Sequence, residues 1–319
     1  MKRVLAFVLA LLLICSTLVF AFGCDKQDAQ TDEASNEQQN QAADASGNTQ
    51  QDTQSNDQQS SLHEVVLNQN GSYIEYGYGD WKYRYVGEKD GVRNIGLLGY
   101  TGQAKDLTVP ATINGNRVTA VISFKDNGVE ILRLPDSVVI LEINCCARNQ
   151  SLKELYCGNG LQRIGQQAFN DCSALEKVVF SSQLTGIGSG AFLNCKLQTI
   201  TIPAGASIGL DAFANNTTLT SITFEDGVTT ITESFTNCCN IQTLTIPASV
   251  TQINGSPFYH PQSRLTSVRF LGNAPTFSNG AEPFGPANPD ITIYYPANAT
   301  GWNTTALGEL YTLTPYQPE

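Results

Sequence analysis

Cysteine and histidine are the side chains of this sequence best suited to chemistry, as nucleophiles or as zinc ligands. The 319-residue chain contains nine cysteines and two histidines, His63 and His260. No two cysteines are spaced as C-x-x-C, two pairs are vicinal (Cys145-Cys146 and Cys238-Cys239), and neither histidine lies near them in the sequence. Zinc sites depend on closely spaced ligands of these types. We therefore expect structural thiols, no metal and no cofactor, with a zinc site as the alternative.

Motifs that carry out catalysis are also scarce. The chain has no P-loop and no H-E-x-x-H motif, and neither His63 nor His260 has the strand-end context of a catalytic triad. The formal net charge is −11, which disfavours binding to nucleic acid or electrostatic docking on anionic lipid. The sequence therefore predicts that the protein is not an enzyme and has no nucleic-acid partner.

Cys24 is the cysteine placed for covalent modification. Lys2 and Arg3 precede an apolar run from Val4 to Ile14, as in an export signal. The following Ala21-Phe22-Gly23-Cys24 resembles the lipobox of bacterial lipoproteins, which usually has Leu at the first of these positions and a small residue at the second. The resemblance implies a signal peptide over residues 1–24 and lipidation of Cys24. The alternatives are an uncleaved transmembrane anchor, because Val4 to Phe22 is nearly long enough to span a bilayer, and plain secretion without a lipid.

Residues 25–61 have nothing to bury. They contain no Val, Ile, Leu or aromatic residue, so they cannot offset the entropy lost on ordering the backbone. We expect a disordered tether that holds a folded domain away from the membrane, on the outer face of the cell envelope.

From about residue 129 the chain repeats itself every 21–24 residues. Each unit starts with a segment of the form L-x-x-L-x-L. The copies begin at Leu152, Leu175, Leu197, Leu219, Ile241 and Leu265. A second segment, with the pattern I-G-x-x-A-F, follows in most units and places phenylalanine at 169, 192, 213, 235 and 258.

A fixed period of this length predicts a solenoid, in which each unit buries its apolar face against its neighbours. Apolar residues two apart point to the same side of a strand. The sequence therefore predicts a mainly β repeat solenoid with a parallel sheet on one face and short turns or 3-10 segments on the other. A β-sandwich with coincidental spacing is the alternative.

The combined unit resembles the BspA-like leucine-rich repeats of bacterial surface proteins. Residues 161–172 and 197–213 match most fully, residues 107–121 resemble the first repeat of that family, and residues 291–302 resemble its ending. The resemblance implies a horseshoe-like solenoid and a role in surface adhesion or recognition. Two departures predict irregular shape: Cys145-Cys146 replaces Ala-Phe, and residues 275–289 carry Pro-rich insertions.

Three cysteines, Cys172, Cys195 and Cys238, recur at the ends of repeats, where a small side chain can sit inside and satisfy backbone groups of the turn. The ends of the chain complete the predicted layout. Residues 62–106 alternate polar and apolar residues and predict an N-terminal β cap, although their Tyr and Trp content would also suit a ligand site. We place the solenoid at residues 107–290 and a C-terminal cap at 291–319.

Residues that alternate with the buried strand positions form the candidate partner-binding face, because they point outward from the sheet. We expect the charged and aromatic side chains of the first repeats, Arg133, Tyr156 and Lys177, to contribute most, and the threonines to contribute little. One outward column is expected to end at Thr292. The candidate residues are Arg133, Glu154, Tyr156, Lys177, Thr199, Thr201, Thr223, Thr245 and Arg269.

These patterns predict a monomeric, lipid-anchored recognition or adhesion protein. Its partner would be a protein or a glycan on a host cell or a neighbouring cell, and it would touch the membrane only through its anchor. A structural spacer or co-receptor subunit without a ligand of its own is the main alternative. A solute-binding lipoprotein fits less well, because that class needs two lobes and a cleft.

Overall fold

The computed structural model describes residues 74–278, 282–285, 291–305 and 307–318, all within the unit that spans Ser61–Glu319. The predicted signal peptide, Cys24, the predicted tether and the first part of the predicted cap lie outside the described residues. Among the described residues, no helix has the length and apolar character needed to cross a bilayer.

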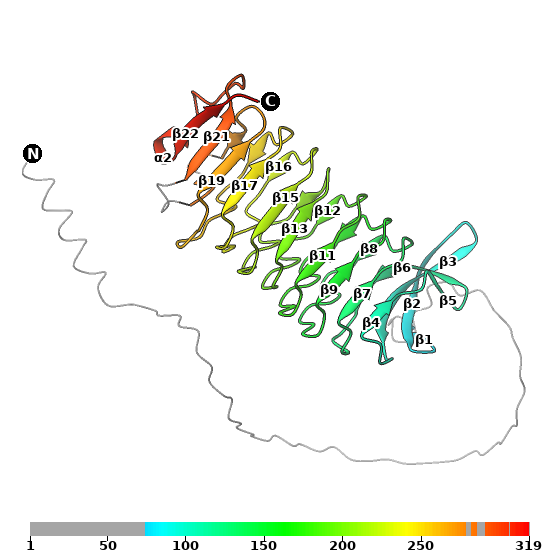
Figure 1. Ribbon diagram of the computed structural model, residues 1–319. Coiled ribbons are helices and arrows are strands. Elements are labelled where there is room, and N and C mark those ends of the chain that lie inside the picture. Colours follow the sequence, from blue (N-terminus) through cyan, green and yellow to red (C-terminus); the bar gives the residue numbers. More distant parts are fainter. Residues whose placement is uncertain (1–73, 279–281, 286–290, 306, 319) are drawn as a thin grey trace, which may run out of the picture. The chain divides into compact units, whose positions relative to one another are not determined.

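The described chain is a mainly β solenoid whose strands follow one another in sequence order (Figure 1). The L-x-x-L-x-L segments supply one side, which we call face A. Its strands are β4 (Asp106–Thr108), β7 (Ile131–Arg133), β9 (Glu154–Tyr156), β11 (Lys177–Val179), β13 (Thr199–Ile202), β15 (Ser221–Phe224), β17 (Thr243–Ile246), β19 (Ser267–Phe270), β21 (Thr292–Pro296) and β22 (Thr312–Tyr316). Within face A all hydrogen-bonded strand pairs are parallel.

Apolar alternation produces face A as predicted. In β13, Thr199 and Thr201 are exposed while Ile200 and Ile202 are buried. The leucines that open successive units, Leu152, Leu175, Leu197 and Leu219, are each 0% exposed. Each unit therefore contributes one buried leucine to the core shared by the stack.

A second parallel sheet, face B, replaces part of the turns that the sequence predicted opposite face A. Most of its strands have only two residues, too few for a visible alternation. They are β6 (Asn116–Val121), β8 (Ile140–Leu141), β10 (Arg163–Ile164), β12 (Gly186–Ile187), β14 (Ser207–Ile208), β16 (Thr230–Ile231), β18 (Gln252–Ile253) and β20 (Thr276–Phe277). Each of these short strands except β20 has one buried Ile or Leu, so face B also packs against the core.

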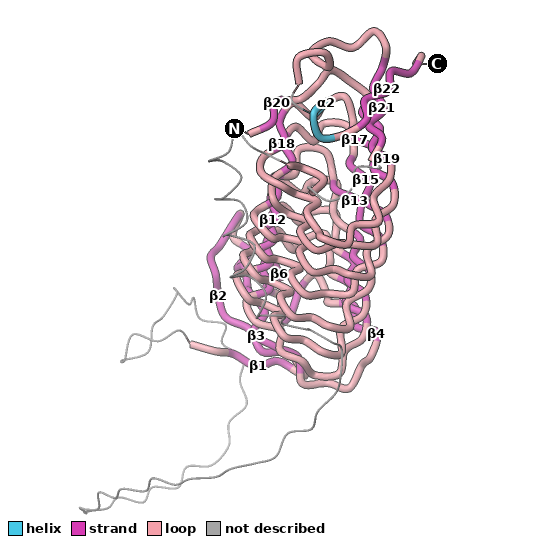
Figure 2. Tube along the Cα trace, turned by 90° about the vertical axis from the view of Figure 1, so that its left-hand side faces the viewer, coloured by secondary structure: helices cyan, strands magenta, loops and turns pink. Residues whose placement is uncertain are grey.

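Turns close the third side of each coil, and Figure 2 shows loops running between the strands of face B, such as β6 and β12, and those of face A, such as β4 and β13. The motif phenylalanines lie behind these turns and stack in a column: the Phe169 and Phe192 rings are 5.1 Å apart with 2° between their planes. The column continues through Phe213, Phe235, Phe258 and Phe284. Stacked aromatic rings add attraction to the area they bury, so the column stabilises contacts between neighbouring coils.

Glycine follows the isoleucine of face B in three coils, where the preceding coil leaves no room for a side chain. A Cβ atom on Gly165, Gly188 or Gly209 would lie 2.4 to 2.6 Å from backbone atoms of the preceding coil. The same glycines donate backbone hydrogen bonds across this gap, as Gly188 N does to Ile164 O over 2.8 Å. The I-G pair therefore allows the coils to approach closely at this corner.

The irregularity predicted at Cys145-Cys146 is absent. Cys146 takes the phenylalanine position and keeps the turn bond of that position, from Cys146 N to Ala168 O over 2.8 Å. Asn144 and Arg148 adopt the same left-handed backbone (φ 56° and 62°) as their counterparts Gln167 and Asp171 in the next coil. The prediction was wrong because backbone hydrogen bonds between coils, rather than the ring, set the turn.

Cys172, Cys195 and Cys238 lie inside the turns as predicted. Each thiol donates to a carbonyl oxygen of the preceding coil, at 3.1 to 3.3 Å from sulfur to oxygen. Burial raises the pKa of Cys172 and of Cys238 to about 12. These thiols therefore stay protonated, and a protonated thiol is a poor nucleophile and metal ligand.

The N-terminal strands β1 (Tyr76–Tyr78), β2 (Trp81–Lys89) and β3 (Val92–Tyr100) form an antiparallel meander. β3 then pairs in parallel with β6, and the short β5 (Thr112–Ile113) pairs with β6 as a hairpin. Tyr83, Ile95 and Leu97 are buried in the common core, so this meander covers the apolar end of the stack. At the other end, α2 (Leu307–Leu310) precedes β22, which extends face A by one strand.

Candidate binding surface

Face A brings the predicted outward residues into columns. Arg133 aligns with Tyr156, Thr201 with Thr223, and Thr245 with Arg269. The prediction that this column ends at Thr292 is wrong, because Tyr294 lies beside Arg269 and Thr292 lies beside Ser267. The last coil holds two more residues before its strand than the sequence alignment allowed.

Arg133 is held by two neighbouring coils. Its guanidinium donates to both oxygens of Asp106, at 3.1 and 3.2 Å, and stacks over the Tyr156 ring with its central carbon 4.2 Å from the ring centroid. A two-point ion pair of this kind fixes the orientation of the guanidinium plane.

Tyr156 lies between two cations. Lys177 approaches the ring from the next coil, with Nζ 5.0 Å from the centroid and 2.9 Å from the Tyr156 hydroxyl oxygen. The Tyr156 hydroxyl donates to Glu154 over 2.5 Å, and Lys177 Nζ lies 3.7 Å from the same carboxylate. The pKa of Lys177 is raised, first by its contact with Tyr156 and further by Glu154. The structure thus joins Asp106, Arg133, Glu154, Tyr156 and Lys177 into what we call the Tyr156 cluster.

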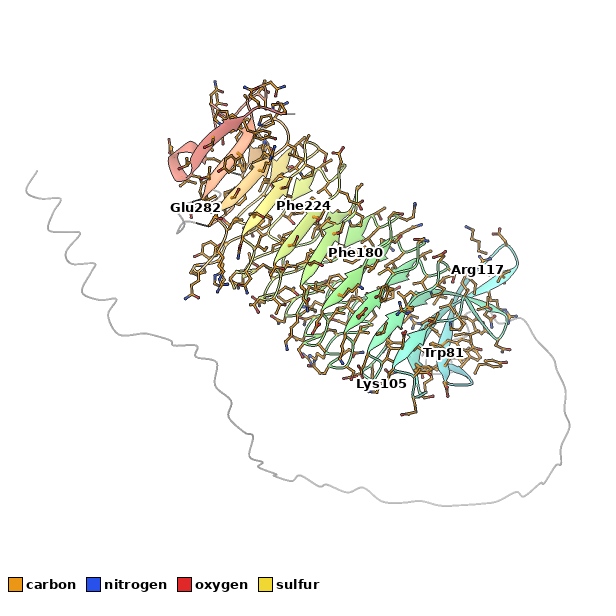
Figure 3. The ribbon with its side chains drawn as sticks, viewed as in Figure 1. Trp81, Lys105, Arg117, Phe180, Phe224 and Glu282 are labelled. Carbon is orange, nitrogen blue, oxygen red and sulfur yellow. The ribbon has the colours of Figure 1, made fainter. Side chains whose placement is uncertain are left out.

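A second row of charges flanks this cluster and was missed in the sequence. Glu130 accepts hydrogen bonds from Lys105 and Lys153, each over 2.7 Å, and these two partners lower the pKa of Glu130 to about 2. Figure 3 labels Lys105 beside the first strands of face A. These residues stand just before each strand, at the repeat spacing, and that spacing is the signal that could have identified them.

The remaining candidate residues do not join this cluster. Thr199, Thr201, Thr223 and Thr245 form an exposed, uncharged middle section. Arg269 lies near the C-terminal end, where its guanidinium carbon is 4.1 Å from the centroid of Tyr316. Face A therefore has a charged N-terminal section, a hydroxyl-bearing middle and an aromatic C-terminal end.

One motif was overlooked in predicting that the protein is not an enzyme. Gly205-Ala-Ser207-Ile-Gly209 matches G-x-S-x-G, the pattern of a serine nucleophile at a strand-to-helix turn. Here Ser207 lies in β14 of face B and its hydroxyl donates to Thr185 O over 3.1 Å. His260, the histidine among the described residues, also bonds close to itself in the sequence: its Nδ1 accepts a hydrogen bond from Gln262 N. Within the described ranges, no three His, Cys, Asp or Glu side chains lie close enough together to hold a metal ion.

Comparison with known proteins identifies the repeats. The family described as BspA type leucine rich repeat region matches in six copies, over residues 121–208 and 139–266. Curated proteins give no match.

Solved structures of leucine-rich-repeat proteins are similar to the chain. One from Bacteroides ovatus is 15% identical, with 76% of this chain and 77% of that chain covered and a TM-score of 0.48. A leucine rich cell surface protein from Faecalibacterium prausnitzii is 16% identical, with 78% and 96% covered and a TM-score of 0.29. The leucine rich repeat protein of T. pallidum is 20% identical, with 67% and 82% covered and a TM-score of 0.36.

Proposed function

Because this chain belongs to the BspA-type leucine-rich-repeat proteins, we propose that it is a non-catalytic recognition protein that binds a partner through face A. The Tyr156 cluster is the observation that carries this proposal. An aromatic ring flanked by two cations on a regular sheet is a preformed contact surface, and Tyr and Arg are enriched among residues that dominate binding energy. The bonds within the cluster already restrict its side chains, so binding would cost less conformational entropy.

The proposed location is the outer surface of a bacterial cell, with attachment through a lipid on Cys24. The export-signal pattern at Lys2, Arg3 and the apolar run that follows supports export. The acidic, apolar-poor segment 25–61 would then separate the solenoid from the membrane. Replacing Cys24 by Ser should abolish incorporation of a palmitate label, and unchanged labelling would contradict lipidation.

A spacer without its own ligand is the second candidate function, and one observation favours it. The Arg133, Lys177, Lys105 and Lys153 cations of the first coils are already paired with carboxylates of the chain. Such internal pairing would also be expected of a purely structural surface.

A capture experiment separates the two functions. The full-length chain is presented to arrays of extracellular-matrix proteins, mucins and cell-wall glycans. The triple variant Arg133→Ala, Tyr156→Ala, Lys177→Ala should lose at least tenfold in affinity for the captured partner, since truncating a central contact residue commonly costs more than 1 kcal/mol.

The matched control truncates three exposed residues of face B, Arg163→Ala, Gln252→Ala and Thr276→Ala. This control should bind as the unaltered chain does, and circular dichroism should show both variants folded. Equal capture by the two triple variants would rule out the Tyr156 cluster, and no capture by the unaltered chain would favour the spacer.

A further inference from the structure

The strand ladder of face A is interrupted between β11 and β13 and again between β15 and β17. At the first of these junctions Gln198 N still donates to Glu176 O over 3.1 Å, and the second is the one beneath the groove described below. β15 pairs with β13 through four residues, and β17 pairs likewise with β19, but β15 and β17 belong to separate sheets. On face B the interruption lies one junction earlier, between β14 and β16. The coil of residues 221–235 is therefore hydrogen-bonded to the preceding coil through face A and to the following coil through face B.

The sequence of this coil explains the interruption on face B. Ile187 and Phe192 are five residues apart, as are Ile208 and Phe213, whereas Ile231 and Phe235 are only four apart. The corner has also lost its glycine, and Thr232 stands there. The Thr232 hydroxyl, rather than a backbone N–H, donates to Ile208 O over 2.9 Å. Loss of the glycine alone does not interrupt the ladder, because Glu142 and Asn254 hold the same corner position and still donate backbone hydrogen bonds to Val121 O and Ile231 O, each over 2.9 Å. The residue missing from this corner is therefore the feature that sets it apart from the others.

A groove of about 340 Å³ lies over the junction between β15 and β17 on face A. Figure 3 labels Phe224 at the end of β15, beside this junction. Ile222 and Phe224 line the groove although their side chains are buried in the core, so the groove reaches the backbone of β15. Peptide groups that lack a ladder partner at this junction are free to hydrogen-bond a ligand or water.

The groove walls carry hydroxyl groups and apolar surface. Its eight lining residues are Ser221, Ile222, Thr223, Phe224, Thr243, Thr245, Pro247 and Leu271. None of the eight is charged. Leu271 is 44% exposed at the rim, in contrast to the buried apolar residues of the strands. Hydroxyls above an apolar base complement a ligand that has both hydroxyl groups and C–H faces.

We propose that this groove is a binding site for a neutral oligosaccharide, whose hydroxyls would be bonded by Thr223 and Thr245 and whose C–H face would rest on Pro247 and Leu271. This inference rests on the proposed recognition function and names a ligand class and a subsite for it. The groove would bind its ligand through threonines of face A, which were expected from the sequence to contribute little to binding.

Two other ligand classes fit the groove less well. An inserted peptide strand would need about 9.6 Å between its two neighbours, twice the spacing of paired strands, but Cα atoms of β15 and β17 approach within 8 Å. A charged glycan would find no counter-ion among the lining residues, and burying its charge against apolar surface would cost free energy.

The test is titration calorimetry of the full-length chain with cellotetraose, mannotetraose and, as the charged comparison, tetragalacturonate. At least one neutral tetrasaccharide should bind, and tetragalacturonate should bind more weakly. The variant Thr223→Val, Thr245→Val removes two hydroxyls at nearly constant shape and should weaken binding at least tenfold. The matched control Thr199→Val, Thr201→Val makes the same change on β13, outside the groove, and should stay within twofold.

Three results would contradict the proposed oligosaccharide site: no binding of either neutral tetrasaccharide, equal losses of affinity in the two double variants, or preference for tetragalacturonate. These failures are distinguishable from failure of the proposed function. If the chain captures a macromolecule through Arg133, Tyr156 and Lys177 but binds neither neutral sugar, only the proposal for the groove is rejected. If the chain binds sugar but captures its macromolecular partner equally well with or without the Tyr156 cluster, only the proposed role of that cluster is rejected.

Discussion

At the scale of single residues, Glu130 shows how the repeat turns surface charges into a ladder. Its carboxylate lies between Lys105 and Lys153, one from the preceding coil and one from the following coil. Exposed ion pairs usually contribute little to stability. Glu130 differs from an isolated pair because two lysines share it, and both are positioned by strands that the core fixes.

Glu130 should make the stability of the solenoid depend on pH in the acid range. Its pKa falls from 4.5 to about 2 on folding, so its contribution is complete above pH 4.5 and is lost as the pH falls toward 2. The melting temperature of Glu130→Gln should therefore lie below that of the unaltered chain at pH 6, and the difference should vanish near pH 2. Scanning calorimetry at several pH values measures this.

The control for this prediction is Glu88→Gln in the N-terminal meander, a carboxylate without an ion pair among the described residues. Its melting temperature should follow that of the unaltered chain at every pH. Added salt should also narrow the Glu130→Gln difference, because it screens exposed charges. A difference that persists unchanged at pH 2 would show that the two lysines do not act through the charge of Glu130.

At the scale of the single coil, the glycine after the face B isoleucine sets how closely neighbours approach. A Cβ atom on Gly188 would lie 2.5 Å from Gln166 N, where it would displace rigid backbone. Gly188→Ala should therefore destabilise the chain by about 1–3 kcal/mol, the usual cost of overpacking. Urea unfolding measures it. Gly186→Ala is the control, because its Cβ would meet only Ser207 Oγ at 3.5 Å; equal losses in both variants would contradict the close-approach argument.

The coil is also the scale at which sequence reasoning succeeded and failed. The leucine and phenylalanine columns were predictable because their spacing exceeds chance, and the fold follows from them. Face B was not predictable, since a strand such as Arg163–Ile164 is too short to show alternation. Phe124 and Phe284 were missed as well: both are buried, but Cys146 separates the first from the column, and the second lies within the Pro-rich segment 275–289.

The candidate site was predictable only in part for a related reason. Alternation identified Arg133, Tyr156 and Lys177 as outward, but their partner Asp106 lies in the first coil, whose leucine motif is degenerate. The groove lies over the break between β15 and β17, and the sequence contains no sign of it, because both strands keep the same alternation of buried and exposed residues. Which side chains meet between neighbouring coils depends on the register of their strands. The repeat pattern of the sequence predicts that register only where every unit has the same length.

At the scale of the whole solenoid, the two ends of the stack determine whether it stays a single molecule. The meander β1–β3 covers the N-terminal end of face B, but β22 has a neighbour on one side only. An exposed edge strand can pair with another chain unless something prevents it. Pro315 supplies that protection. Thr312 N donates to Ile291 O and Tyr316 O accepts from Ala297 N, so these alternate residues face β21 and Pro315 faces the open edge without an N–H group.

Restoring this N–H should expose the edge. We expect the unaltered chain to sediment as a monomer, and Pro315→Thr to self-associate at micromolar concentration through pairing of β22 with a second chain. Sedimentation velocity measures the change. Thr314→Val alters a neighbour whose N–H faces β21 and should leave the chain monomeric. Proline also restricts the conformations of the unfolded chain, so circular dichroism is used to check that Pro315→Thr still folds. A folded, monomeric Pro315→Thr would show that the tyrosine and arginine side chains at this end, rather than the missing N–H, keep the molecules apart.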